Sequence, residues 1–167
     1  AASRVRLVAW PYEPYNPYLN LLPQGSVISV TQGPLERGDL EKEPRLVSVT
    51  FDARPASELA APPVAIHADL GGLFRLAGAE IKGDGPRLHL TLLWQSLKPT
   101  DVNYMVFVHV QQPDFPLTAG DGPTAQGYYS TNLWRAGDWI IDERVVELPS
   151  AFDPARDQVI IGMYDLT

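Results

Sequence analysis

Apolar and polar residues alternate along much of this 167-residue chain with a period of two, the period at which side chains of a β-strand change faces. The clearest example is residues 87–94, where every second position carries a large apolar side chain: Leu88, Leu90, Leu92 and Trp94. The positions between them are mostly polar, and residues 4–10 alternate in the same way. We therefore expect antiparallel strands with one face in the core and the other in water.

Eight segments have strand character, because they are rich in Val, Ile, Leu, Thr and aromatic residues. They are residues 4–10, 26–30, 45–51, 74–81, 87–94, 104–110, 139–148 and 158–166. Residues 104–110 and 158–164 are apolar on both faces, which predicts central strands covered on both sides, and Gly78 predicts a bulge. Many short strands without a convincing amphipathic helix predict an all-β fold, an antiparallel β-sandwich with jelly-roll-like topology.

The segments between the strands are rich in proline and glycine. Residues 10–25 hold four prolines, which predicts an extended, polyproline-II-like path with its tyrosines over the surface. Residues 33–44 predict a polar hairpin-type connection, and residues 56–61 predict one helical turn capped by Ser57. Residues 111–139 are far longer than the usual connection of about 4–6 residues. Such a long ordered loop either packs as a lid or carries function.

Composition narrows the range of partners. The net charge is −7 and the 13 basic residues form no run, which argues against nucleic acid and anionic membrane surfaces as partners. The chain has no cysteine, which excludes disulfides and thiolate chemistry. No apolar stretch approaches the roughly 20 residues that span a bilayer. The first ten residues also lack a signal-peptide pattern, so we expect any signal or anchor to lie outside these residues.

The segment YYSTNLWRAGDW, residues 128–139, is the first candidate for a binding site. Seven residues in and near it combine rings that can stack on sugars with groups that can bind hydroxyls: Asp121, Tyr128, Tyr129, Asn132, Trp134, Arg135 and Trp139. The alternative is structural: Trp134 and Tyr128 anchor the long loop on the sandwich, and Gly137 turns the chain into the next strand. We favour the anchor, because pinning so long a loop is a sufficient cause for these residues.

Three carboxylates are candidates for hydrolase chemistry: Asp121, Asp142 and Glu143. A glycosidase needs two carboxyl groups about 5–5.5 Å or about 6.5–9.5 Å apart across a cleft. Neighbours in a strand point to opposite faces, so at most one of Asp142 and Glu143 can join Asp121. An Asp before Gly-Pro is more often a turn former, and a lone strand Asp more often pairs with a nearby Arg. We therefore expect no catalytic residues and no enzymatic activity in this chain.

Metal and cofactor sites have little support in the sequence. The three histidines, His67, His89 and His109, are too far apart for a local zinc motif, and His109 is expected to donate a hydrogen bond across the sheet. No nucleotide-binding or serine-hydrolase motif is present. We expect no cofactor, with a structural calcium ion in a loop left open.

From about residue 73 onward the chain resembles the C-terminal β-sandwich module of large bacterial, Chloroflexi-type membrane glycosyltransferases. These are the polyprenyl-phosphate-dependent enzymes of family 39, similar to mannosyltransferases. The resembling stretches are residues 74–81, 90–110, 121–149 and 158–166. The spaced positions that carry the resemblance are Trp94, Pro99, Asp101, Tyr104, Phe107, His109, Asp121, Pro123, Gly127, Tyr128, Thr131, Trp134, Gly137, Asp142, Gly162, Tyr164 and Asp165. Ser130 departs from the pattern, since a proline is frequent there.

The resemblance implies a context for the chain. The chain length predicts one β-sandwich domain over residues 1–167. The resemblance makes residues 73–167 its family-like core, and residues 1–60 are expected to add N-terminal strands and the Pro/Tyr-rich loop. It places the domain on the extracytoplasmic face of the cell membrane, as a soluble part of a membrane protein. Sugar transfer would occur in the membrane-embedded part of the same parent chain, which would be the main partner of this domain.

Three functions follow as hypotheses. The first is a non-catalytic extracytoplasmic module of a membrane glycosyltransferase that assists recognition of a glycan or acceptor. The second is a carbohydrate-binding module acting through exposed aromatic residues, which needs at least two accessible rings among Tyr12, Tyr15, Tyr18, Tyr129 and Trp139. The third, least favoured, is a free-standing glycoside-acting enzyme that uses Asp121.

Overall fold

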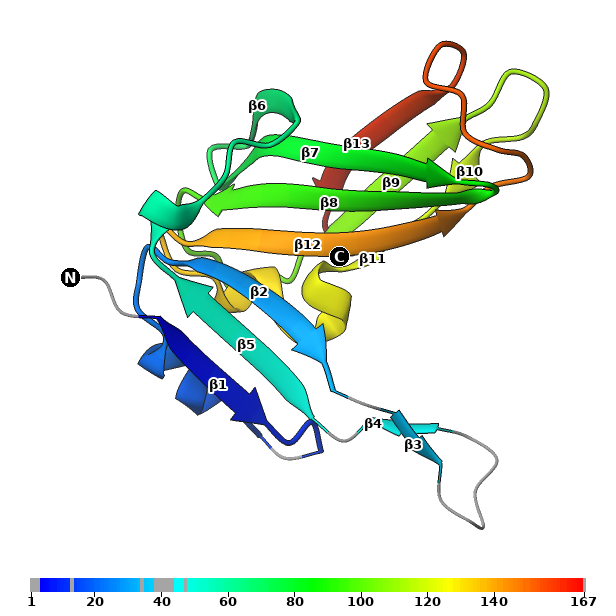
Figure 1. Ribbon diagram of the computed structural model, residues 1–167. Coiled ribbons are helices and arrows are strands. Elements are labelled where there is room, and N and C mark those ends of the chain that lie inside the picture. Colours follow the sequence, from blue (N-terminus) through cyan, green and yellow to red (C-terminus); the bar gives the residue numbers. More distant parts are fainter. Residues whose placement is uncertain (1–3, 13, 34, 38–43, 47, 167) are drawn as a thin grey trace.

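The computed structural model describes all residues except 1–3, 13, 34, 38–43, 47 and 167. In the described part, most of the regular secondary structure is β-strand (Figure 1). A seven-stranded sheet has the order β1 (Val5–Ala9), β5 (Val49–Arg54), β2 (Val27–Gln32), β12 (Trp139–Glu147), β8 (Arg87–Ser96), β7 (Phe74–Asp84) and β6 (Val64–Leu70). All neighbours are antiparallel except β2 and β12, which run parallel.

A second, smaller sheet is built around β9 (Met105–Gln111). It consists of β9, β13 (Gln158–Tyr164) paired along it, and the short strands β10 (Thr118–Ala119) and β11 (Gly122–Pro123) at its two ends. A separate hairpin pairs β3 (Leu35–Arg37) with β4 (Pro44–Leu46). Four short 3-10 turns complete the elements: η1 (Asn16–Leu21), η2 (Ala56–Glu58), η3 (Thr124–Gly127) and η4 (Thr131–Leu133).

The core lies between the two sheets and confirms the predicted all-β sandwich. The inward face of β8 carries the four residues expected there, all of them buried: Leu88, Leu90, Leu92 and Trp94. The buried residues of β9 belong to the same cluster: Val106, Val108 and Val110. Burying each such side chain contributes roughly 1.5–3 kcal/mol. β1, β2 and β5 add residues to this cluster, so the first sixty residues complete the larger sheet.

The prediction that β13 is a central strand covered on both sides is wrong. Among the described residues β13 pairs with β9 alone, so it lies at the edge of its sheet, where Ile160 is 50% exposed. The outer face of β9 is only half-buried. Its Phe107 ring lies over Gly162, where an added Cβ would come within 2.4 Å of that ring. Phe107 also contacts the rings of His109 and Tyr164, so these apolar residues cover one another instead of lying beneath another layer.

β6 was not predicted from its sequence, and Gly78 forms the bulge that was predicted. The register between β6 and β7 shifts between Ala65 and Ala68, and His67 there has a positive φ of 58°. The register between β7 and β8 shifts next to Gly78. A Cβ on Gly78 would lie 2.3 Å from Pro62 Cγ, so only glycine lets the chain pass this closely.

The proline-rich segment 10–25 departs from the extended path expected for it. It contains the 3-10 turn η1, with a proline at the start that has the backbone angle the turn needs. Tyr12 and Tyr18 are exposed, as expected, but Tyr15 is partly buried and packs on Phe51 with 5.4 Å between ring centroids.

Two smaller predictions have mixed outcomes. The single turn expected in 56–61 is present as η2, but its cap is Pro55 and Ser57 makes no capping hydrogen bond. The hairpin expected in 33–44 is present as the paired strands β3 and β4, while 38–43 lie outside the described residues. Among the described residues, no helix is long and apolar enough to cross a membrane.

Candidate functional site

The middle part of the ring-bearing segment 128–139 is buried inside the protein. Trp134 and Tyr129 are almost completely buried, at 2% and 1% exposed. The Trp134 indole Nε1 donates a hydrogen bond of 3.1 Å to the Tyr129 carbonyl, which also accepts one of 2.8 Å from Thr124 Oγ1. Tyr15 donates its hydroxyl proton to the Tyr128 carbonyl at 2.8 Å. The Tyr129 and Trp134 rings are enclosed by protein, which leaves neither with an open face for a sugar.

A buried carboxylate fastens the end of this segment to the N-terminal part of the chain. Asp138 is fully buried and accepts hydrogen bonds from the Gly25 N–H at 2.7 Å and from Arg135 Nε at 2.9 Å. Arg135 also donates to the Leu22 carbonyl at 2.7 Å. Burial, followed by the nearby Asp138 charge, raises the pKa of the Tyr129 phenol. The Arg135 guanidinium therefore already binds a carboxylate and a backbone carbonyl of the protein. The sequence analysis did not predict Asp138 as its partner.

The remaining residues predicted in this segment lie in more open positions. Asn132 is exposed and its side-chain oxygen accepts a 2.6 Å hydrogen bond from Ser130 Oγ. Trp139 is half-buried at the start of β12 and Tyr128 is half-buried in the loop. Gly137, at φ 90°, makes the turn into β12 that was predicted for it. The structure thus does not gather these residues around one cavity.

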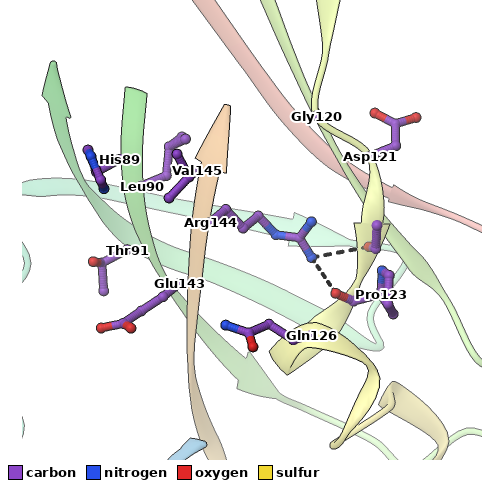
Figure 2. A pocket seen from close by; sticks show the side chains of 11 residues that line it. His89, Leu90, Thr91, Gly120, Asp121, Pro123, Gln126, Glu143, Arg144 and Val145 are labelled. Atoms are coloured by element: carbon purple, nitrogen blue, oxygen red, sulfur yellow. Dashed lines mark hydrogen bonds between the residues drawn. The ribbon is translucent and has the colours of Figure 1, made fainter. Parts of the chain in front are cut away.

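A hollow with polar walls lies elsewhere, along β12 and beside the segment that connects β10 to η3 (Figure 2). It has a volume of about 630 Å³. Its lining comes from β8, β12 and residues 120–126: His89, Leu90, Thr91, Gly120, Asp121, Gly122, Pro123, Gln126, Glu143, Arg144 and Val145. We call this hollow the β12 groove. Of the predicted site residues it contains only Asp121.

A buried ion pair holds the two walls of the β12 groove together. Asp142 is buried on the inward face of β12, and Arg144, two residues on, shares that face. Arg144 Nε donates to Asp142 Oδ2 at 2.8 Å, and its side chain extends to the carbonyls of Gly122 and Pro123 at 3.1 and 2.9 Å (Figure 2). The other oxygen of Asp142 accepts the Ala125 N–H at 3.0 Å. The lone strand Asp thus pairs with a nearby Arg, as expected.

Removal from water raises the pKa of the Asp142 carboxyl, and Arg144 and the Ala125 N–H offset only part of this effect. The neighbouring Glu143 is exposed on the opposite face of β12. These two acids therefore point to opposite faces of the strand, as predicted from their adjacent positions.

The wall opposite β12 contains left-handed backbone. Ala125 and Gln126 have φ values of 46° and 57°, and Gly127 follows at 89°. For a residue other than glycine this conformation costs roughly 1–2 kcal/mol. Such strain persists only where surrounding contacts enforce it, and it concentrates at functional sites. Here the Ala125 bond to Asp142 helps to enforce it, and the exposed Gln126 side chain lies in the β12 groove as a result.

Several polar groups in the β12 groove have no hydrogen-bond or ion-pair partner among the residues that the structure describes. Within the described part of the chain, no hydrogen bond or ion pair engages the side chains of His89, Thr91, Gln126 and Glu143. Asp121 differs, because His109 Nε2 lies 3.3 Å from its carboxylate and the carboxylate points away from Arg144 (Figure 2). His109 therefore pairs with a side chain of the β10–β11 segment.

The β12 groove thus offers hydrogen-bond donors and acceptors beside apolar surface from Pro123 and Val145. Such a mixture suits a ligand rich in hydroxyl groups. Among the residues that the structure describes, no three His, Asp or Glu side chains lie close enough together to hold a metal ion. The sequence could have revealed the Asp142–Arg144 pair from its two-residue spacing, but nothing in it linked His89, Thr91 or Gln126 to the groove.

Comparison with protein-family models, with curated proteins and with solved structures finds no match to this chain.

Proposed function

We propose that this chain is a non-catalytic β-sandwich module that binds a glycan or a glycan acceptor in the β12 groove. In this proposal the module belongs to a membrane glycosyltransferase and holds the ligand on the extracytoplasmic side, beside the membrane-embedded catalytic part. The catalytic part of the parent chain is then its partner in the assembly.

One observation carries the binding role. Four polar side chains without protein partners in the described part of the chain line one groove: His89, Thr91, Gln126 and Glu143. The buried Asp142–Arg144 pair fixes the two walls in place before any ligand arrives. A preformed site loses less conformational entropy on binding, which favours affinity. Hydroxyl-rich ligands match such groups, because each hydroxyl can both donate and accept.

The glycosyltransferase context rests on the resemblance of residues 73–167 to the modules of those enzymes. The ring-bearing segment supports a structural role for the shared aromatic positions, since Trp134 and Tyr129 are buried. A shared motif that anchors a loop is compatible with a module whose ligand site lies elsewhere.

A glycan-binding measurement tests this proposal. The isolated domain is screened on a glycan array, and the best ligand is titrated calorimetrically against wild type, Glu143→Gln and Glu147→Gln. We expect Glu143→Gln to weaken binding by about tenfold or more, because hydrogen bonds to a charged group are the stronger ones. Glu147 lies on the same face of β12 but outside the groove, so its variant is the matched control. The proposal would be contradicted if the domain bound no glycan on the array, or if the two variants bound the best ligand with equal affinity.

A second candidate site has one observation in its favour. Trp10 and Tyr12 are 51% and 62% exposed, and their ring centroids lie 5.4 Å apart. An accessible aromatic pair can stack on pyranose rings. Trp10 was not among the rings named for the carbohydrate-binding-module hypothesis; of those rings, Tyr12 and Tyr18 are exposed. In the same titration, loss of binding in Trp10→Ala with unchanged binding in Glu143→Gln would assign the ligand to this pair.

A further inference from the structure

A second hollow lies on the outer face of the large sheet, next to the part of the β12 groove that Thr91 and Glu143 line. Its volume is about 390 Å³. Its lining combines the segment after η2 with residues from four strands: Arg54, Leu59, Ala60, Ala61, Pro62, Pro63, Glu80, Thr91, Leu93 and Ile141. Thr91 lines both hollows. On β12 the lining passes from Ile141 in the second hollow to Glu143 in the first, two residues along one face.

The two hollows therefore join into one elongated surface along β8 and β12. A strand rises about 3.3 Å per residue, so the four steps from His89 to Leu93 cover about 13 Å. This length exceeds what a single small sugar would occupy and suits a chain of several units.

The second hollow differs from the first in its chemistry. Its surface is mainly apolar, from residues such as Leu59, Pro62 and Ile141. Arg54 at the end of β5 lines it, and within the described residues the Arg54 side chain has no hydrogen-bond or ion-pair partner. The acid of this hollow, Glu80, is already paired with Lys82 at 2.8 Å. The hollow therefore presents an unpaired positive charge beside apolar surface.

We infer, on the basis of the function proposed above, that the ligand is an extended acidic oligosaccharide that lies across both hollows. Its neutral, hydroxyl-rich units occupy the β12 groove, and a sugar carboxylate reaches Arg54 in the second hollow. The Glu143 carboxylate beside Thr91, where the hollows meet, and Arg54 in the second hollow impose one direction on the chain, because an acidic unit is repelled by the first and attracted by the second.

An acidic sugar fits these walls better than an acyl chain does. Thr91 lies where the two hollows meet, and Glu143 lies beside it on the neighbouring strand β12. An acyl chain lying across them would remove water from these polar groups without replacing its hydrogen bonds, which disfavours binding. Sugar hydroxyls replace those hydrogen bonds, while the C–H faces of the rings cover Leu93 and Ile141.

The test compares two tetrasaccharides that differ only in charge. One carries a single terminal glucuronate, and the other is its methyl ester, which keeps the size and removes the charge. Both are titrated calorimetrically against wild type, Arg54→Gln and Arg6→Gln, with decanoate as a third probe. Arg6 lies on the same face of the sheet in β1 and is paired with Asp52, so its variant controls for the loss of one positive charge.

We expect wild type and Arg6→Gln to bind the acid about tenfold more tightly than the ester, the effect of one charge-assisted hydrogen-bonded contact. Arg54→Gln is expected to bind both equally, with the affinity of the wild type for the ester. Equal binding of acid and ester by wild type would overturn this inference and leave the proposed glycan function standing. Binding of decanoate in place of either sugar, or binding of none of the probes, would overturn both.

Discussion

Arg144 joins Asp142 to the opposite wall of the β12 groove. Its guanidinium contacts the Asp142 carboxylate at 2.8 Å on its own strand and the Pro123 carbonyl at 2.9 Å on the segment across from it. Its side chain is 9% exposed and that of Asp142 is 1% exposed. The geometry of the groove therefore depends on an ion pair that water barely reaches.

Replacing Arg144 with methionine is expected to destabilise the domain by about 3–5 kcal/mol, because the Asp142 charge is then buried without a partner. The free energy of unfolding in urea measures this loss. Arg87→Met is the control, since Arg87 pairs with Glu147 on the surface, and such pairs contribute about 0–1 kcal/mol. Equal losses for the two variants would contradict the structural role of Arg144.

Asp142 is expected to make the stability of the domain depend on pH. Burial raises its pKa in the folded state above the ordinary value of 3.8, so the folded state holds this proton more tightly than the unfolded state. The resulting stabilisation is present below that ordinary value and is lost as pH rises through the folded-state pKa. We expect Asp142→Asn to remove this part of the pH dependence. The measurement compares the slope of unfolding free energy against pH for the variant and the wild type. Identical slopes would show that folding does not raise the pKa of Asp142.

Tyr129 is expected to lower the stability of the domain in alkali. Its phenol is buried near Asp138, which raises its pKa above the ordinary value of 10.0. Because the folded state disfavours the phenolate, stability is lost as pH rises above the unfolded-state value. Tyr129→Phe is expected to unfold at a higher pH than wild type, as followed by ultraviolet absorbance and circular dichroism. The exposed Tyr12→Phe serves as control and is expected to behave as wild type.

The alternation of apolar residues was enough to predict the sandwich, and the exceptions have physical reasons. Leu88 to Trp94 alternate because one sheet face is buried and the other is wet. β6 could not be predicted, because an exposed edge strand with a bulge at His67 has no buried face to leave a pattern. The covered position expected for β13 was wrong, because Phe107 and its neighbouring rings cover one another on the outer face.

The candidate site was less accessible to sequence reasoning. The spacing of Asp142 and Arg144 reveals a pair on one face of a strand, but not that the pair reaches Gly122 across the sandwich. The aromatic residues in 128–139 are of the kind that stacks on sugars, whereas in the structure Trp134 is buried and holds the loop in place. The groove residues Gln126 and Thr91 lie on different elements, and only long-range packing brings them together.

Gln126 allows function and stability to be separated. Its φ of 57° is strained for glutamine and free for glycine. Gln126→Gly removes a penalty of about 1–2 kcal/mol but increases the entropy of the unfolded chain, so we expect stability to change by no more than about 1 kcal/mol. Glycan affinity is expected to fall, because the amide no longer reaches the groove. Calorimetric titration and urea unfolding of one preparation give both values, and unchanged affinity would remove Gln126 from the site.

Amide chemical-shift mapping tests the central claim most directly, since it reports where on the sandwich a ligand lies. A tetrasaccharide selected on the array is added to the isotope-labelled domain, and the shifts of assigned amides are followed. We predict saturable changes in residues 89–91, 120–126 and 143–145, with little change at the buried Tyr129 and Trp134. Changes concentrated in residues 128–139, with the groove unaffected, would contradict the claim that the aromatic segment is an anchor and the groove is the binding site.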